Sequence, residues 1–158
     1  MELYHLKDLT DPLVDKIKDD PVRPHIPLEQ RINEAAEILM LKAGEEILAV
    51  TCMQWLADIP KDEDDLVKMA KDKTTAVFYT IWSYSPGAGQ QLLKQAAAWL
   101  LSDFKDEVKN IVTLSPQTEM AKRFHLKNGA RVRRQNETSV NYEYYSSEAS
   151  KLENSEAR

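Results

Sequence analysis

Two glycines stand close together at the start of a predicted helix, in a chain that has only four glycines. Gly87 and Gly89 follow an apolar and aromatic stretch, residues 74–84, and precede a stretch rich in alanine and leucine. A strand, a glycine turn and a helix start aim free backbone N–H groups and the positive end of the helix dipole at one point. The spacing therefore predicts an anion site, of the kind that holds phosphate groups, at residues 87–90.

Two common phosphate-binding motifs do not fit this stretch. A P-loop has the pattern G-x-x-x-x-G-K-[ST], and no Lys-Ser or Lys-Thr pair follows Gly89. A dinucleotide-binding turn needs a third glycine where "GAGQQL" has Leu92, and the next predicted strand ends in Ser115 instead of an acid. Neither motif explains the two glycines.

The elements around the glycines predict an α/β (α+β) fold. Residues 75–84 indicate a strand buried on both faces, residues 90–104 a helix with one apolar face, and residues 111–115 a second buried strand. A strand–helix–strand crossover is nearly always right-handed with parallel strands, so these two strands are predicted to be parallel neighbours. Upstream, residues 37–57 predict a hairpin that turns at Gly44.

The C-terminal half predicts a short helix and two closing strands. Ser115 is expected to cap the helix with Pro116 at its first position, and Gly129 to end it in a left-handed conformation. The expected buried positions of this helix are Met120, Ala121 and Phe124. Residues 131–145 then indicate two strands around "NETS".

This order of elements resembles the GNAT N-acetyltransferases over residues 37–145. Their helix-start signature, [QR]-x-x-G-x-[GA], corresponds to residues 84–89, "YSPGAG", and "TEMAKRFHLKNGA" is similar to a second family segment. The resemblance implies a mixed, splayed central sheet flanked by helices, with acetyl-CoA as co-substrate and an amine as acceptor. It also implies a coenzyme A site, whose residues would be Trp82, Tyr84, Gly87, Ala88, Gly89 and Gln90.

The sequence also departs from the family pattern. Tyr84 stands where the family has Gln or Arg, and His125 stands where a tyrosine often serves as general acid. The segment "RFHLKNGA" is also similar to the corresponding helix end of phage virion-associated proteins that look like divergent GNAT domains. Two functions therefore stay open: an N-acetyltransferase, and a catalytically silent GNAT-fold protein that binds a partner or serves in virion assembly.

Acetyl transfer needs a polarised thioester carbonyl, an amine that has lost its proton, and a proton for the departing thiolate. Backbone groups at residues 81–84 would polarise the carbonyl, whereas neither central strand carries an Asp or Glu that could act as base. Water, Glu45 or Glu46 would have to serve instead. His125 is the candidate proton donor, because imidazole titrates near neutrality and a helix C-terminus favours its cation. The alternative is a histidine that only packs on the helix surface.

Composition limits the other function classes. The net charge is −5 and the pI about 5.3, which gives no electrostatic basis for binding nucleic acid. His5 and His25 lack metal-ligand spacing, so no metal site is expected, and the single cysteine, Cys52, is expected in the core. No apolar stretch is long enough to span a membrane, and the first residues resemble neither a signal nor a transit peptide. We therefore expect a cytoplasmic protein that does not bind a membrane, with no indication of its oligomeric state.

The chain is expected to form one domain over residues 1–145. Residues 146–158 contain few apolar side chains, so this tail is predicted to be disordered.

Overall fold

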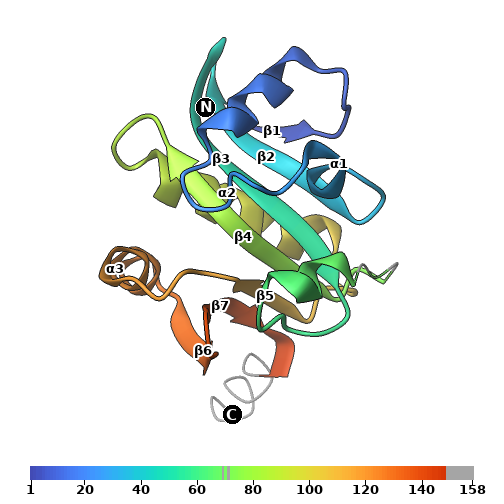
Figure 1. Ribbon diagram of the computed structural model, residues 1–158, viewed down its shortest axis with the longest axis vertical. Helices are drawn as coiled ribbons and strands as arrows, with labels where there is room; N and C mark the ends of the chain where they lie inside the picture. The colour runs from blue at the N-terminus through green and yellow to red at the C-terminus, as the bar shows by residue number, and fades with distance from the viewer. Residues whose placement is uncertain (69, 71, 149–158) are drawn as a thin grey trace.

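One mixed sheet runs through the molecule, in a computed structural model that describes residues 1–68, 70 and 72–148 (Figure 1). Its seven described strands are β1 (Glu2–Leu6), β2 (Ala36–Ala43), β3 (Glu46–Leu56), β4 (Thr75–Ser83), β5 (Asn110–Thr113), β6 (Arg131–Gln135) and β7 (Val140–Ser146). They lie in the order β1–β2–β3–β4–β5–β7–β6. Only β4 and β5 are parallel, and every other neighbouring pair is antiparallel. The predicted mixed sheet and its parallel central pair are confirmed.

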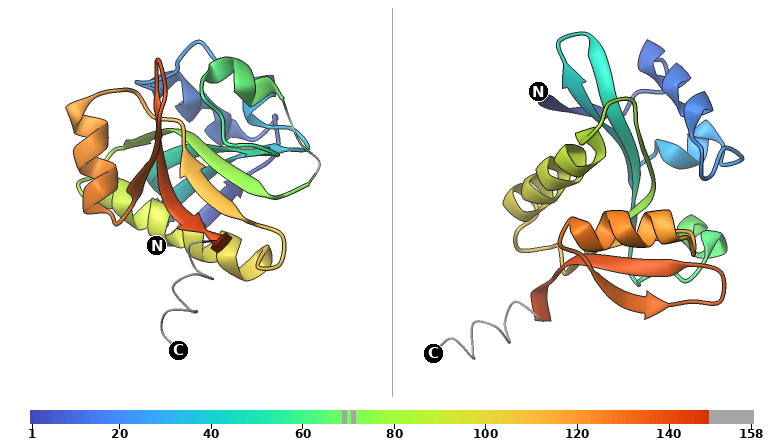
Figure 2. Two further views of the ribbon diagram at one scale, coloured as in Figure 1. Left: turned by 90° about the horizontal axis from the view of Figure 1, so that it is seen from below. Right: turned by 90° about the vertical axis from the view of Figure 1, so that its left-hand side faces the viewer.

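Helices cover both faces of the sheet (Figure 2). The long helix α2 (Ala88–Asp103) crosses one face as the connection between β4 and β5. The opposite face carries η1 (Pro12–Asp19), a 3₁₀ helix, together with the short helices α1 (Leu28–Arg31) and η2 (Glu63–Val67). The remaining helix, α3 (Glu119–Lys127), lies beside β6 and β7.

Each face of the sheet buries its own apolar cluster. Leu92, Leu93, Ala96 and Leu100 recur at helical spacing along α2 and pack on the strands beneath it. On the opposite face, alternate residues of the same strands pack against the N-terminal segment. Strands β3 and β4 are therefore buried on both sides, as the apolar stretch at residues 75–84 predicts.

Two turns that need glycine lie where the sequence predicts them. Gly44 has φ 61° in the tight turn between β2 and β3, and Gly129 has φ 92° just after α3. Both φ values lie in the left-handed region, which glycine enters without the steric penalty of a Cβ atom.

Two expectations for the α3 region are wrong. Ser115 does not cap α3, because its backbone N–H and carbonyl both pair with Val140 and hold it in an extended conformation. The helix starts later, and the Thr118 hydroxyl caps it by accepting from the N–H of Ala121 at 3.2 Å. Met120, expected in the core, has 82% of its surface exposed.

The predicted tail falls mostly outside the described residues. Ser146 is the last residue of β7, and the N–H of Ser147 donates to the carbonyl of Lys109 at 2.9 Å. The first residue of the expected tail is therefore part of the sheet, and residues 149–158 lie outside the described part of the chain.

Candidate functional site

The parallel pair β4 and β5 separates halfway along β4. The two strands pair from Thr75 with Asn110 to Phe78 with Thr113, and the N–H of Leu114 makes one further bond to the carbonyl of Phe78. Beyond that point β4 continues to Ser83, whereas the chain after β5 pairs with β7 through Ser115. An extra residue at Tyr79 also shifts the register of β4 against β3, and such a bulge bends a strand. The C-terminal ends of β4 and β5 thus diverge, as predicted.

A mostly apolar cleft of about 680 Å³ opens at this divergence. Its walls come from β4, from the chain after β5, from the starts of α2 and α3, and from the loop at Pro21 and Val22. The volume lies within the range of clefts that hold small molecules and cofactors. The lining residues include Phe78, Tyr79, Ile81, Trp82, Gly89, Leu93, Leu114, Ser115, Thr118, Ala121, Phe124 and His125.

The start of α2 lies at the edge of this cleft. Gly87 precedes the helix with φ 78°, and no side chain of the described residues caps the first turn. The N–H of Ala88 donates to the carbonyl of Ser85 at 3.2 Å, so it is already engaged. A helix start leaves its first N–H groups without intrahelical partners. The N–H groups of Gly89 and Gln90 are therefore placed to bind an anion.

Gly89 lies against Phe124 of α3. A Cβ atom on Gly89 would lie 3.4 Å from two ring atoms of Phe124, at the close end of ordinary van der Waals contact. Gly87 faces open space, and its left-handed φ alone explains a glycine there.

Tyr84 and Trp82 are not equivalent in the structure. The hydroxyl of Tyr84 donates to Asp19 at 2.7 Å and accepts from the Trp82 indole at 3.0 Å. Tyr84 is therefore tied to the N-terminal segment and does not line the cleft, whereas Trp82 does. The N–H of Tyr84 is also engaged, since it donates to the carbonyl of Leu48. Among the residues expected to bind coenzyme A, the structure places Trp82 and Gly89 in the cleft wall and residues 87–90 at its rim.

His125 lies in the cleft wall, but not as a half-exposed surface residue. Only 4% of its surface is exposed, and burial lowers its pKa to about 4. The imidazole is therefore neutral at pH 7, in contrast to the cation that the helix C-terminus was expected to favour. Its ring stacks on Tyr142, with ring centroids 4.9 Å apart. A neutral imidazole can accept a proton, whereas a resident proton donor would have to be the cation.

Two partners of His125 were missed by the sequence analysis. The Oγ of Ser115 lies 3.2 Å from Nε2 of His125, and the hydroxyl of Tyr144 lies 2.7 Å from Nδ1. Ser115 was interpreted as a helix cap. The alternation of Val140, Tyr142 and Tyr144 does place the two tyrosines on one face of β7, but their contact with α3 is a tertiary contact that no local pattern encodes.

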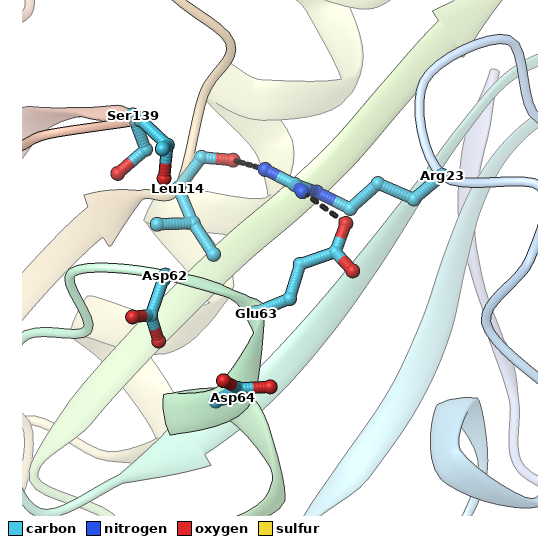
Figure 3. A pocket seen from close by; sticks show the side chains of 7 residues that line it. Arg23, Asp62, Glu63, Asp64, Leu114 and Ser139 are labelled. Atoms are coloured by element: carbon cyan, nitrogen blue, oxygen red, sulfur yellow. Dashed lines mark hydrogen bonds and ion pairs between the residues drawn. The ribbon is translucent and has the colours of Figure 1, made fainter.

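A second, charged cavity of about 450 Å³ lies near the same divergence of β4 and β5 (Figure 3). Asp62, Glu63 and Asp64 line it together with Arg23, and Leu114 lines both cavities. Nε of Arg23 donates to the carbonyl of Tyr79 on β4 at 2.8 Å. Its Nη2 donates to the carbonyl of Leu114 after β5 at 2.9 Å. Arg23 therefore bridges the two diverging strands.

Glu63 lines the charged cavity and pairs with Arg23, the residue that bridges the two diverging strands. Its two oxygens accept from Nη1 of Arg23 at 2.5 Å and bond to Nε2 of His25 at 2.7 Å. Burial opposes ionisation of Glu63, but the bonds to His25 and Arg23 outweigh it and lower the pKa. Glu63 is thus a paired anion, whereas Glu45 and Glu46 lie in the β2–β3 turn region.

Neither Cys52 nor a cluster of metal-ligating side chains marks a further site in the described part of the chain. Cys52 is fully buried, and burial raises the pKa of its thiol to about 11. Over residues 1–68, 70 and 72–148, no three His, Cys, Asp or Glu side chains group as a metal ion would require. Within the same part of the chain, no helix is long and apolar enough to cross a bilayer.

Comparisons with known proteins give structural neighbours only. No protein-family model and no curated protein matches the sequence. Malonyl-CoA decarboxylase from Cupriavidus metallidurans superposes with a TM-score of 0.69 at 15% identity, over 91% of this chain and 60% of that one. The Bacillus subtilis acetyltransferase in complex with CoA gives 0.61 at 15% identity, over 90% and 96% of the two chains.

A third neighbour is the GNAT domain of PAT from S. lividans. It superposes with a TM-score of 0.62 at 14% identity, over 90% of this chain and 88% of that domain. The arrangement shared with these structures is the one seen here, a mixed sheet flanked by helices. The chain therefore has the fold of the GNAT acetyltransferases.

Proposed function

We propose that this protein is an N-acyltransferase that moves an acetyl group from acetyl-CoA to an amine. The observation that carries the proposal is the place of the apolar cleft. It opens where β4 and β5 diverge, and the uncapped glycine turn of α2 lies at its edge. A cofactor with a phosphate-rich end and a long, mostly uncharged arm matches such a site. Neighbours with bound coenzyme A support the choice of cofactor.

The parts of the cleft suit different parts of acetyl-CoA. The pyrophosphate would accept from the backbone N–H groups of Gly89 and Gln90 at the start of α2, because an anion is favoured at a helix N-terminus. The pantetheine arm would pass along the apolar wall toward the diverging strands. The thioester carbonyl would then meet the β4 backbone at Ile81 or Ser83. The N–H of Tyr84 donates to Leu48 of β3, and the alternation of an antiparallel ladder turns the N–H of Trp82 toward β3 as well.

The charged cavity suits the acceptor. Asp62, Glu63 and Asp64 line it, and a cleft lined by carboxylates raises the local concentration of a protonated amine. The amine must lose a proton before it attacks the thioester carbon, and the CoA thiolate must gain one when it leaves. Leu114 lines both this cavity and the apolar cleft, so an amine held in the cavity would reach the thioester past Leu114.

Two measurements on the purified protein test the proposal. Titration calorimetry with acetyl-CoA and with free CoA should show binding of both, and mass spectrometry should then show acetylation within a panel of small amines and lysine peptides. Failure of the protein to bind either form of coenzyme A would contradict the proposal. Binding without acetylation of any amine would favour the alternative, a catalytically silent GNAT-fold protein.

A further inference from the structure

Ser115, His125 and Tyr144 form a chain of hydrogen-bonding groups in the wall of the apolar cleft. Oγ of Ser115 lies 3.2 Å from Nε2 of His125, and Nδ1 of the same ring lies 2.7 Å from the Tyr144 hydroxyl. Ser115 and His125 both line the cleft, and each has only 4% of its surface exposed. The three residues come from the chain after β5, from α3 and from β7, so the fold alone brings them together.

The surrounding structure holds this chain in place. Backbone bonds of 2.9 Å in both directions pair Ser115 with Val140, and the His125 ring is stacked on Tyr142. A reactive group needs such support, because small displacements of a nucleophile from its base are costly. Ser115 is also placed where β5 leaves β4, which is where the thioester would lie under the proposed function.

The three residues have the arrangement of an activated nucleophile. In that arrangement a hydroxyl lies within reach of a base, and a third group orients the base. A proton on Nδ1 that donates to Tyr144 leaves Nε2 free to accept from Ser115. Ser115 also donates to Oγ1 of Thr113 at 2.7 Å, but a hydroxyl proton rotates between two acceptors. Burial holds the imidazole neutral, and only the neutral form can accept a proton.

We propose that Ser115 is a nucleophile that takes the acyl group from the CoA thioester, and this rests on the proposed function. Oγ of Ser115 attacks the thioester carbonyl carbon, an O–C bond forms and the C–S bond breaks. The serine proton passes to Nε2 of His125 and from there to the departing CoA sulfur. The product of this half-reaction is an acyl-serine ester and free CoA.

The second half-reaction restores the serine. An amine or a water molecule attacks the ester carbon and forms a new N–C or O–C bond, and its proton passes to Nε2 of His125. The bond between that carbon and Oγ of Ser115 breaks, and His125 returns the proton to Oγ. With an amine the product is an amide, which is the proposed transfer. With water alone, acyl-CoA and water give a carboxylic acid and CoA. The inference therefore adds a thioester-hydrolysing activity in the absence of an amine.

The test exposes the protein to acetyl-CoA without any amine. We expect one acetyl group on the peptide that contains Ser115, found by mass spectrometry after an acid quench, and continued release of CoA thiol as the ester hydrolyses. Ser115→Ala should abolish both signals yet keep CoA binding in calorimetry, which shows that it still folds. Ser102→Ala is the matched control, because Ser102 is exposed near the end of α2 and should leave both signals unchanged.

Two further variants separate the roles of the other members. His125→Gln should slow acetylation of Ser115 by about 10²–10⁴-fold, the usual contribution of a general base. Tyr144 is a positioning residue, and Tyr144→Phe should lower the rate less. It should also move the midpoint of the pH–rate profile to lower pH, because the imidazolium loses an acceptor at Nδ1. A merely structural role of Tyr144 would not move that midpoint.

The outcomes distinguish this inference from the proposed function. If CoA binds but neither the adduct nor the amine-free release of CoA depends on Ser115, the inference is overturned and direct transfer to the amine remains. If the parent protein binds no CoA, both proposals are overturned together.

Discussion

Two buried sites on opposite faces of the sheet treat their titratable groups in opposite ways. Beside α3, His125 has no charged partner among the described residues and is held neutral by burial. On the side of η1 and α1, Asp20 and Arg31 have completely buried side chains that lie 2.7 Å apart. Burial thus neutralises His125, whereas Asp20 and Arg31 keep their charges.

Asp20 stays charged and His125 does not because their hydrogen-bond partners differ. Burial alone would raise the pKa of Asp20, but its carboxylate accepts from the N–H groups of Arg23 and Val22, from Arg31 and from the Thr80 hydroxyl. Together these donors lower the pKa below its ordinary value. His125 has neutral partners only, so desolvation dominates. Burial therefore removes a charge only where the fold supplies no compensating partners, which are donors for a carboxylate and acceptors or an anion for an imidazolium.

The free energy of unfolding should be more sensitive to a single substitution in the Asp20–Arg31 pair than to one at His125. Arg31→Met leaves the buried Asp20 carboxylate without its cation, which typically costs about 3–5 kcal/mol of unfolding free energy. Denaturant titration of the variant measures this loss. Lys18→Met is the control, because the Lys18–Asp15 pair is exposed and its removal should leave the free energy of unfolding nearly unchanged. Equal effects of the two substitutions would contradict a specific role for the buried pair.

The burial of neutral His125 should make the stability of the protein depend on pH. An exposed histidine has a pKa near 6.5, whereas His125 has a pKa of about 4 in the folded protein. Between these pH values only the unfolded chain binds the proton, so stability is full above about pH 6.5 and falls as the pH drops to about 4. The difference corresponds to about 3 kcal/mol. Thermal or denaturant unfolding from pH 7 to pH 4 measures it.

A matched variant isolates the histidine in this pH range. His125→Gln should lose less stability than the parent between pH 6.5 and pH 4, since glutamine does not titrate. The lowered pKa of Asp20 acts in another window, because its contribution is lost only as the pH falls below about 4. Parallel pH curves for parent and variant would show that His125 is not held neutral by burial.

The same contrast explains what could be predicted from the sequence. The apolar spacing of α2, the buried strand at residues 75–84 and the hairpin turn at Gly44 follow from local periodicity and turn chemistry, and all are confirmed. The bonds of Arg23 to Tyr79 and Leu114 join residues 56 and 91 positions apart. Charges in "DDPVRPH" look like a solvated loop locally, so their burial could not be predicted. The Ser115–His125–Tyr144 chain is a tertiary arrangement of the same kind.

The smallest effect is expected at the rim of the cleft, where Gln90 lies in the first turn of α2. Gln90→Glu places a negative charge beside the expected pyrophosphate site, and repulsion should weaken CoA binding by about tenfold in calorimetry. The same charge is favourable for a helix N-terminus, so stability should stay equal or rise by about 0.3–1 kcal/mol. Gln91→Glu is the control, because it adds the same charge one residue later on the exposed side of the helix. Equal loss of binding in both variants would indicate a general charge effect.

The central claim is that the apolar cleft holds a CoA thioester with its phosphates at the start of α2. A crystal structure of the protein with bound CoA tests this claim most directly. We predict the pyrophosphate at the glycine turn of residues 87–90, bound by the N–H groups of Gly89 and Gln90, and the pantetheine arm between the diverging ends of β4 and β5. A complex in which the pyrophosphate lies away from α2, or in which coenzyme A leaves this cleft empty, would contradict the claim.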